Sequence, residues 1–382
     1  MQPDNAALIV LAAGGTGGHI FPAEALARAL LTRGLRVALV TDRRGGKFSD
    51  DLSVPVHRIH AHKFGNGLSG KLKGIAFMAL GYVQARLLLR KLKPAAVIGF
   101  GGYPSAPTVY AAAVAHIPVI LHEQNAVLGR ANRVLMGQAQ LIATSFPQVA
   151  GLRGGGNAPR LVQTGNPVRP AFAGLRTQPY PAMREDGTLN LFVMGGSQGA
   201  RIFSSVVPQA LGLLPESLRR RIAVAQQCRS EDLELARTNF SGAGIDAELA
   251  SFFRDVPERM ARCHLAICRA GGSTIAELTA IGRPSILVPL PHGHQMEQIA
   301  NAEALAEAGG AWVIPQDGFT PEALAVRLEA LLTLPATREK TAAAARAWGT
   351  VAAAENLADC VADLIAAPVQ GHNGDHNQTR AA

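Results

Sequence analysis

The residues GGTGGH, at positions 14 to 19, place four glycines and a histidine between an apolar run and a helical pattern. Glycine is costly inside regular structure, so this cluster predicts a tight turn where the backbone approaches a ligand closely. The helix should begin near His19, with Leu26, Leu30 and Leu31 on one face. Its unpaired amides and the positive end of its dipole would then favour an anion in the turn.

Two other interpretations of this turn stay open. The dinucleotide fingerprint G-x-G-x-x-G fits poorly, because its third glycine would fall at Ile20. Asp42, which ends the next predicted strand, keeps a dinucleotide site open as a minor alternative, since an acidic residue there can bind a ribose. A purely structural turn is the second alternative, because glycine-rich turns are common in α/β folds.

The same device recurs along the chain. Glycine turns follow further predicted strands in GGYPSAP (101–107), GGSQGAR (195–201) and CRAGGSTIAEL (268–278). In parallel sheets, ligands bind beyond the carboxyl ends of the strands. Two domains with such turns would face each other across a cleft that binds anions, such as phosphorylated ligands.

Short β-branched runs alternate with helical patterns, which predicts an α/β chain of right-handed βαβ units and parallel sheets. The predicted strands lie near 7–12, 36–41, 95–99, 118–122, 140–143, 161–164, 189–194, 221–226, 264–268, 284–289 and 311–314. A chain of 382 residues fits two domains. We expect an N-terminal domain over 1–166, a Pro-rich and charged linker over 167–187, a C-terminal domain over 188–350, a terminal helix over 351–367 that packs back toward the first domain, and a disordered polar tail over 368–382.

Charge is distributed unevenly between the two halves. Residues 1–169 hold 19 Lys and Arg against 6 Asp and Glu, a net charge of +13, whereas residues 170–382 hold 18 against 22, a net charge of −4. No acidic residue lies between Asp51 and Glu123. Nucleic acid is a poor candidate partner, because no known binding motif appears and aromatic residues are sparse.

The basic stretch KLKGIAFMALGYVQARLLLRKLK, residues 71–93, predicts a helix. Its apolar content exceeds what one buried face needs, because Phe77, Met78 and Tyr82 do not all share the stripe formed by Leu80, Val83 and Leu87. A core helix with solvated ends is one interpretation. The other is a face that docks on an anionic membrane through Lys71, Lys73, Ile75, Phe77 and Met78, where apolar insertion and cationic attraction add.

Several classes of protein are disfavoured. Cys228, Cys263, Cys268 and Cys360 form no secreted framework, and no second ligand pair accompanies them, so they predict reduced, packed thiols. No apolar run approaches the roughly 20 residues of a membrane span, and the N-terminus predicts a first strand rather than a signal peptide. No Asp-x-Asp occurs, so a bound diphosphate would depend on helix ends, amides and Arg rather than on Mg²⁺.

Seven separated motifs carry a family resemblance over roughly residues 7 to 365. GGTGGHIFPA, GFGGYPSAP, LHEQNAVLGRANR, TGNPVRP, GGSQGAR, CRAGGSTIAEL and EQIANA occur in the order found in the MurG family. The resemblance implies a GT-B architecture of two Rossmann-like domains and an inverting, metal-independent and cofactor-free transfer. N-acetylglucosamine would pass from UDP-GlcNAc to the muramyl 4-hydroxyl of lipid I, giving lipid II for peptidoglycan, at the cytoplasmic face of the inner membrane beside cell-wall and division proteins.

The resemblance also implies donor-binding residues. The turn Thr16, Gly17 and Gly18 resembles the family's donor-contacting turn, and Asn125 its donor-side amide; Arg169 and Ser197 resemble contacts to UDP. Phe253 corresponds to a residue whose backbone reads uracil. The nucleoside stretch is Gly272, Ser273, Thr274, Ile275, Ala276 and Glu277, with Glu277 on the ribose hydroxyls. Gln298 resembles the glutamine that reads the sugar hydroxyls, with Gln295 as the alternative, and a carboxylate and an amide suit these hydroxyl partners.

On the acceptor side, we expect the lipid diphosphate at the two N-terminal glycine turns, with Gly14, Gly15, Gly101, Gly102 and Tyr103. A base must take the proton of the acceptor hydroxyl, and His19 is the candidate, since a helix N-terminus disfavours its cationic form. His19 could instead bond to backbone or hold the diphosphate. His122 and Glu123 are rival bases, although an acid that ends a strand often holds the next loop.

Two other functions stay open at this point. A UDP-sugar epimerase on the same architecture would need acids around the sugar, which the acid-poor N-terminal half argues against. A membrane adaptor that binds a nucleotide sugar without turnover is the non-enzymatic alternative.

Overall fold

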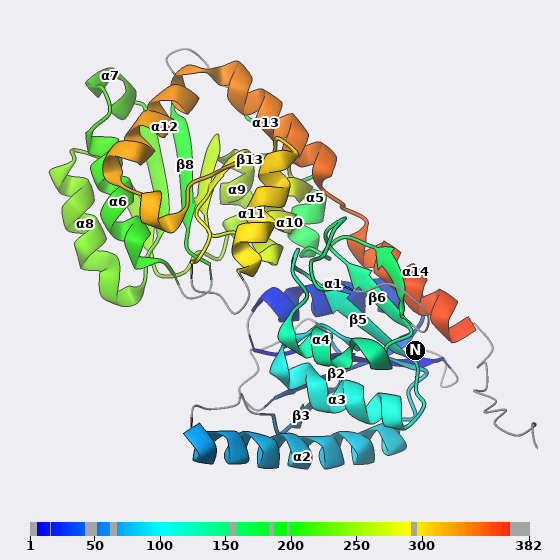
Figure 1. The fold of residues 1–382 in the computed structure, drawn as a ribbon. Helices are drawn as coiled ribbons and strands as arrows, with labels where there is room; N and C mark the ends of the chain where they lie inside the picture. Colours follow the sequence, from blue (N-terminus) through cyan, green and yellow to red (C-terminus); the bar gives the residue numbers. More distant parts are fainter. Residues whose placement is uncertain are drawn as a thin grey trace, which may run out of the picture.

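The computed structural model describes residues 6–15, 17–42, 52–61, 67–152, 158–182, 187–196, 199–291 and 296–366, apart from the side chains of residues 68, 69, 71 and 72. Two α/β units are visible, one above the other (Figure 1). Each is built on a parallel sheet. The expected polar tail over 368–382 lies outside the described residues.

The N-terminal unit has a seven-stranded parallel sheet of order β3-β2-β1-β4-β5-β6-β7. Its strands are β1 (Leu8–Ala12), β2 (Arg36–Asp42), β3 (Val56–Ile59), β4 (Ala96–Gly99), β5 (Val119–Glu123), β6 (Leu141–Thr144) and β7 (Arg160–Gln163). Its helices are α1 (Gly17–Thr32), α2 (Gly67–Leu92), α3 (Gly102–Val114) and α4 (Arg130–Leu135), with a short 3-10 turn over Met136–Gln138. The strand order reverses direction between β1 and β4, which is where open α/β sheets bind ligands.

The C-terminal unit repeats this order with six strands, β10-β9-β8-β11-β12-β13. The strands are β8 (Leu189–Met194), β9 (Ile222–Gln227), β10 (Ala247–Ala250), β11 (Leu265–Cys268), β12 (Ser285–Leu287) and β13 (Ala311–Val313). The helices are α5 (Pro170–Gly174), α6 (Arg201–Gly212), α7 (Glu216–Arg219), α8 (Leu233–Gly242), α9 (Val256–Arg262), α10 (Gly272–Ala280), α11 (Glu297–Glu307), α12 (Pro321–Thr333) and α13 (Pro335–Trp348), with 3-10 turns at Ser230–Asp232 and Gln316–Gly318. They are followed by α14 (Ala353–Ala366), which packs on the N-terminal unit.

Alternation along the strands divides each core into two layers. In β1, Ile9 and Leu11 pack under α1, whereas Val10 packs with the helices on the opposite face. The last helix, α14, buries Leu357 and Val361 in the core beside α1 (Figure 1). The chain therefore ends its described part on the N-terminal unit.

Two strands were missed by the sequence interpretation, β3 and β10. Both are edge strands, so each has one hydrogen-bonded neighbour and little buried surface. Their sequences, VHRI and AELA, contain charged or polar residues among the apolar ones instead of forming a continuous β-branched run. All the strands that the sequence predicted are confirmed, with their ends shifted by a few residues at most.

The structure shows which apolar face of α2 is exposed. Leu80, Val83 and Leu87 are 44%, 51% and 60% exposed, so the stripe that they form faces outward. Ala85 and Leu89 are buried instead. Helical periodicity finds a stripe, but it does not choose between two apolar faces of one helix. None of the helices in the described ranges is long and apolar enough to cross a membrane.

Candidate functional site

His19 lies in the first turn of α1, directly after the glycine turn that follows β1. Its Nδ1 is 2.8 Å from the carbonyl oxygen of Phe100, the residue that follows β4. Burial lowers the pKa of His19, and the hydrogen bond with Phe100 opposes this shift in part. The imidazole is therefore neutral near pH 7, and its desolvation is the main cause.

The second N-terminal glycine turn meets His19 from the other side. Gly101 and Gly102 have φ of 81° and 70°, a region that glycine enters without strain. A Cβ added to Gly102 would lie 3.2 Å from Nε2 of His19. Nδ1 makes the ring's contacts with Phe100 and Gln124, and Nε2 makes no hydrogen bond with the described part of the chain. The two turns thus come together around one titratable side chain.

The glycines of the first turn have different structural reasons. A Cβ on Gly14 would lie 2.8 Å from side-chain atoms of Pro104 and Thr41, so this glycine permits close packing against α3. Gly15 has φ of 89° and open space around its Cβ position. Tyr103 donates from its hydroxyl to Asp42 at 3.3 Å. Thr16 lies outside the described residues.

The N-terminus of α10 brings the C-terminal unit against these turns. A Cβ on Gly272 would lie 2.4 Å from the carbonyl oxygen of Gln124, so glycine is needed for this backbone contact. Ser273 donates from Oγ to the carbonyl oxygen of Gly18 at 3.4 Å. The structure thus brings Gly17, Gly18, Gly272 and Ser273 into one region.

Arg169 and Glu277, both expected at the donor, pair with each other. Nη2 of Arg169 lies 2.8 Å and Nε 3.0 Å from the same carboxylate oxygen of Glu277. The guanidinium also lies 4.8 Å from the ring of Phe21 and 4.9 Å from that of Phe172. Burial raises the pKa of Glu277, and Arg169 opposes the shift. This pair forms a charged junction between α1, α5 and α10.

Asn125 lies beside a buried amide of the other domain. Asn301, on α11, donates to Oδ1 of Asn125 at 3.0 Å and accepts from the backbone amide of Ala126 at 2.7 Å. It also donates to the carbonyl of Ala270 at 3.0 Å. Asn301 is fully buried, so it fixes the position of the 125–126 loop against the C-terminal unit.

The rival bases both have structural roles. The Glu123 carboxylate accepts from the amides of Asn125 at 3.0 Å and Gly129 at 2.8 Å, and from the Asn132 side chain at 2.8 Å. Burial raises its pKa, and these donors oppose the shift. His122 is fully buried, bonds to the Gly165 carbonyl at 3.2 Å, and has its pKa lowered by burial to about 4.

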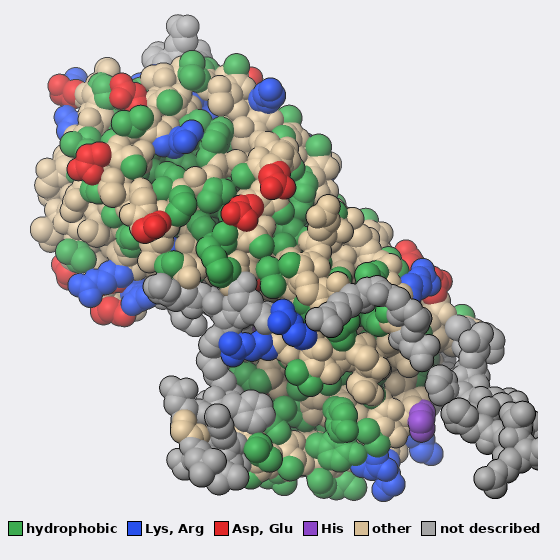
Figure 2. Space-filling view, in the orientation of Figure 1, with side chains coloured by type: hydrophobic (Ala, Val, Ile, Leu, Met, Phe, Trp, Pro, Cys, Tyr) green, Lys and Arg blue, Asp and Glu red, His purple; other side chains and the backbone are tan. Residues whose placement is uncertain are grey.

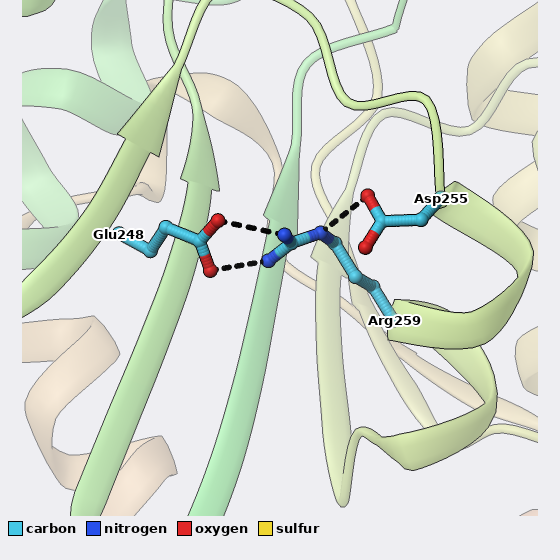
Figure 3. A network of polar contacts seen from close by, with 3 residues as sticks. All are labelled: Glu248, Asp255 and Arg259. Carbon is cyan, nitrogen blue, oxygen red and sulfur yellow. Dashed lines mark hydrogen bonds and ion pairs between the residues drawn. The ribbon is translucent and has the colours of Figure 1, made fainter.

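Phe253 lies on the loop after β10. Its ring is 6% exposed and packs 6.0 Å from Phe192, with the Arg259 guanidinium 4.1 Å from its centroid. Arg259 binds both oxygens of Glu248 and, through Nε, Asp255 (Figure 3). Two carboxylates raise the pKa of Arg259, so it stays charged. These contacts hold the loop that carries Phe253 against β10 and α9.

The remaining expected residues are placed as follows. Gln298, in the first turn of α11, accepts from the amide of Leu290 at 3.1 Å. Thr274, Ile275 and Ala276 lie on α10, where Ile275 is a core residue. Ser197 and Gln295 lie outside the described residues. Among the described residues, no three His, Cys, Asp or Glu side chains are grouped so as to hold a metal ion.

Two polar residues of this region were not singled out from the sequence. Gln124, whose amide nitrogen lies 2.7 Å from Nδ1 of His19, stands in the quoted motif LHEQNAVLGRANR, and Asn301 stands in EQIANA. The signal available was a polar residue at the carboxyl end of a predicted strand for Gln124. No comparable signal points to Asn301, because its partners in the other domain, Asn125 and Ala126, lie about 175 residues away along the chain.

Two Rossmann-like parallel-sheet domains that meet in this way define the GT-B class. The chain matches the family models described as "Glycosyltransferase family 28 N-terminal domain" over residues 9–144 and "Glycosyltransferase family 28 C-terminal domain" over residues 190–359. It belongs to glycosyltransferase family 28 and, within it, to the MurG family.

Two curated relatives share the name "UDP-N-acetylglucosamine--N-acetylmuramyl-(pentapeptide) pyrophosphoryl-undecaprenol N-acetylglucosamine transferase". The one from Rhodospirillum centenum is 58% identical over 376 residues, 98% of both chains. The one from Paramagnetospirillum magneticum is 54% identical over 360 residues, 94% of this chain and 97% of the relative.

Solved structures agree on the architecture. The crystal structure of MurG from Acinetobacter baumannii superposes with a TM-score of 0.75 at 28% identity, covering 94% of this chain and 99% of the other. A UDP-GlcNAc 2-epimerase from Neisseria meningitidis gives a TM-score of 0.64 at 14% identity, over 93% of this chain and 99% of the other, which shows the shared fold alone.

Proposed function

We propose that this chain transfers N-acetylglucosamine from UDP-GlcNAc to the 4-hydroxyl of the muramyl sugar of lipid I, giving lipid II for peptidoglycan synthesis. Its relatives carry the name of this activity over nearly the whole chain. The observation that carries the mechanism is the position of His19, a neutral imidazole with a free Nε2 between two glycine turns at the domain junction.

The reaction is an inverting displacement at the anomeric carbon. The acceptor oxygen forms the new bond to this carbon while its proton passes to Nε2 of His19. The bond from the anomeric carbon to the phosphate oxygen breaks, and its electron pair leaves with UDP. Amides at the helix ends and Arg169 stabilise the negative charge of the leaving diphosphate, so the transfer needs no metal ion and no cofactor.

We assign the two substrates to different domains. Residues 1–166 hold the acceptor, with its diphosphate at Gly14, Gly15, Gly101, Gly102 and Tyr103. Residues 188–350 hold the donor, with Glu277 on the ribose, Gln298 on the sugar and the backbone of Phe253 on uracil. The linker 167–187 contributes Arg169, whose pairing with Glu277 would order that carboxylate for a nucleotide.

We also propose that α2 rests on the anionic cytoplasmic surface of the inner membrane, where the acceptor's lipid lies and where cell-wall and division proteins can be met. Ile75 is 56% exposed, and with Leu80, Val83 and Leu87 it gives α2 an outward apolar row. Exposed Lys and Arg flank the row at Lys73, Arg90, Lys91 and Lys93. Figure 2 shows hydrophobic side chains over α2, with Lys and Arg at one end.

Phe77 and Met78, which the sequence placed on the membrane-docking face, are half-buried. We therefore expect the exposed row to contribute more to membrane binding than these two residues do.

Sedimentation with vesicles tests the membrane assignment. Changing Leu80, Val83 and Leu87 together to Ser should reduce binding to anionic vesicles at least tenfold, because each buried apolar side chain contributes about 1.5–3 kcal/mol. Changing Val326, which is 71% exposed on the C-terminal unit, to Ser is the matched control and should leave binding unchanged. Unaltered binding by the triple variant would exclude α2 as the docking face.

The activity itself is tested by UDP release in EDTA, with and without a lipid diphosphate-linked muramyl acceptor. We expect release only with the acceptor, together with a disaccharide product. Release or epimer formation without the acceptor would favour an epimerase. Donor binding without any turnover would favour an adaptor.

A further inference from the structure

Nδ1 of His19, the carbonyl oxygen of Phe100 and Nε2 of Gln124 form a nearly equilateral triangle of polar atoms. Nδ1 of His19 lies 2.8 Å from the Phe100 oxygen and 2.7 Å from Nε2 of Gln124. The same Gln124 nitrogen lies 2.6 Å from the Phe100 oxygen. Gln124 is 5% exposed, so its amide has no free access to water.

The orientation of the Gln124 amide follows from its partners. Reversing the amide would place its oxygen against the Phe100 carbonyl oxygen at hydrogen-bond distance, where two acceptors repel each other. The nitrogen therefore faces the carbonyl and donates to it. Nδ1 of His19 then meets a carbonyl that accepts and an amide that donates.

The triangle cannot make three hydrogen bonds at once. If Nδ1 carries its hydrogen, it donates to Phe100, and its contact with Gln124 joins two donors. If Nδ1 is unprotonated, it accepts from Gln124, and its contact with Phe100 joins two acceptors. The first arrangement leaves Nε2 able to accept a proton, whereas the second places a hydrogen on Nε2.

The C-terminal unit fixes the backbone that carries Gln124. The carbonyl of Gln124 lies directly against Gly272 of α10, where a Cβ would approach to 2.4 Å. Two residues further on, Asn301 of α11 accepts from the amide of Ala126 at 2.7 Å. The position of the Gln124 amide is thus set by contacts with the domain expected to bind the donor.

We propose that Gln124 is a positioning residue that controls the protonation of His19, holding the Phe100 carbonyl as the acceptor for Nδ1–H and opposing a second proton on the ring. The imidazole stays neutral with its free lone pair on Nε2, toward Gly102. Protonation of Nε2 puts a positive charge on the ring, 2.7 Å from the positive end of the Gln124 amide N–H dipole, and this repulsion disfavours the cation relative to the neutral ring. The inference rests on the proposed role of His19 as the base.

Other titratable groups around His19 have defined partners. On β5, His122 bonds to Gly165 and Glu123 holds the following loop. On α3, Tyr103 donates to Asp42 of β2, and Glu277 of α10 is paired with Arg169. Of these groups, His122 is coupled to His19, since a charge on His19 lowers the pKa of His122. Gln124 is the polar side chain in direct contact with Nδ1.

The test combines nitrogen-resolved NMR with pH-rate profiles of the full-length protein. In the unaltered protein at pH 7.5, His19 should show a protonated Nδ1 and an unprotonated Nε2; its signals are assigned by their loss in His19→Ala. Gln124→Glu should raise the pKa of His19 by about one to three units, because a carboxylate would face Nδ1. Gln124→Met, which removes the donor, should raise it by less.

The chain offers a matched control pair. The side-chain oxygen of Gln84, a residue of α2, lies 3.0 Å from Nδ1 of His60. Gln84→Glu places the same new carboxylate beside a different histidine, and it should leave both the His19 signals and the pH-rate profile as they are.

The outcomes separate this inference from the proposed function. A raised His19 pKa together with an equal shift of the acidic limb of kcat/KM supports both. A raised His19 pKa without a shift in the acidic limb of kcat/KM supports the Gln124–His19 coupling but shows that His19 is not the base. A hydrogen on Nε2 in the unaltered protein, or a His19 pKa unchanged in both Gln124 variants, would overturn the inference.

Discussion

The first glycine turn of each domain occupies the same place in the same strand order, yet the two turns present different chemistry. After β1, the first turn of the helix holds a half-buried, neutral imidazole at His19. After β8, the helix begins with Arg201. Gly199 lies close to Arg229, because a Cβ added to this glycine would be 2.8 Å from the Arg229 side chain. Each turn also has one glycine with positive φ and open space around it, Gly15 and Gly196.

The difference teaches how one fold supports two roles. Both turns supply amides and a helix end, which suit phosphate groups. An imidazole held neutral can accept a proton, whereas guanidinium groups stay charged and attract anions. We therefore ascribe proton transfer, beside the acceptor diphosphate, to the N-terminal turn, and binding of the donor diphosphate to the C-terminal one.

Alanine substitutions at two glycines of positive φ would break the comparison most strongly. Gly102→Ala adds a Cβ 3.2 Å from Nε2 of His19, and we expect kcat to fall about 100-fold, as for a reacting group displaced by an ångström. Gly196→Ala adds a Cβ with nothing within 4 Å, so its effect on kcat should be small. Both should lose about 1–2 kcal/mol of unfolding free energy, measured in urea. Equal losses of kcat would mean that the proton site is not at Gly102.

A pair of glutamates sharpens the donor side of the comparison. Glu277→Gln removes the charge that pairs with Arg169, and we expect KM for UDP-GlcNAc to rise about tenfold, as for one lost charged hydrogen bond. Glu248→Gln removes a comparable partner of Arg259 at a side chain that is 59% exposed (Figure 3). Its effect on KM should be within twofold. A KM unchanged by Glu277→Gln would remove that residue from the donor site.

The smallest expected effect is the loss of folding stability at acidic pH that the buried His122 causes. His122 has an unfolded pKa near 6.5 and a folded pKa of about 4, so the unfolded chain binds more protons between these values. Protonation of His122 in the unfolded chain therefore leaves the free energy of unfolding unchanged above pH 6.5 and lowers it as the pH falls toward 4. Between pH 7 and 5.5, this protonation should lower the free energy of unfolding by about 1 kcal/mol. His122→Gln, which can still donate to Gly165, should show a correspondingly flatter pH dependence in urea titrations.

Much of the fold follows from local patterns. β-branched runs marked the central strands, since a strand buried on both faces is apolar throughout. The edge strands β3 and β10 lacked that pattern because solvent covers part of each. On α2, apolar residues lie all round the helix, so packing against the sheet, which sequence periodicity does not contain, chose the buried face.

The site was predictable only in part, for a similar reason. His19 and the glycine turns stand together in short motifs, so local spacing indicated them. The triangle of His19, Phe100 and Gln124 joins three strand ends that are separate in the sequence. The contact of Gln124 with Gly272 joins two domains. Such meetings depend on the tertiary packing of both sheets.

One measurement tests the central claim directly: turnover and donor affinity of His19→Ala, with His116→Asn as the control. His116 is an exposed residue with φ of 55°, a conformation that Asn tolerates. We expect kcat of His19→Ala to fall 10²- to 10⁴-fold, as for loss of a general base, while the Kd for UDP-GlcNAc stays within twofold. Turnover within tenfold of the unaltered protein would contradict the proton-transfer role of His19.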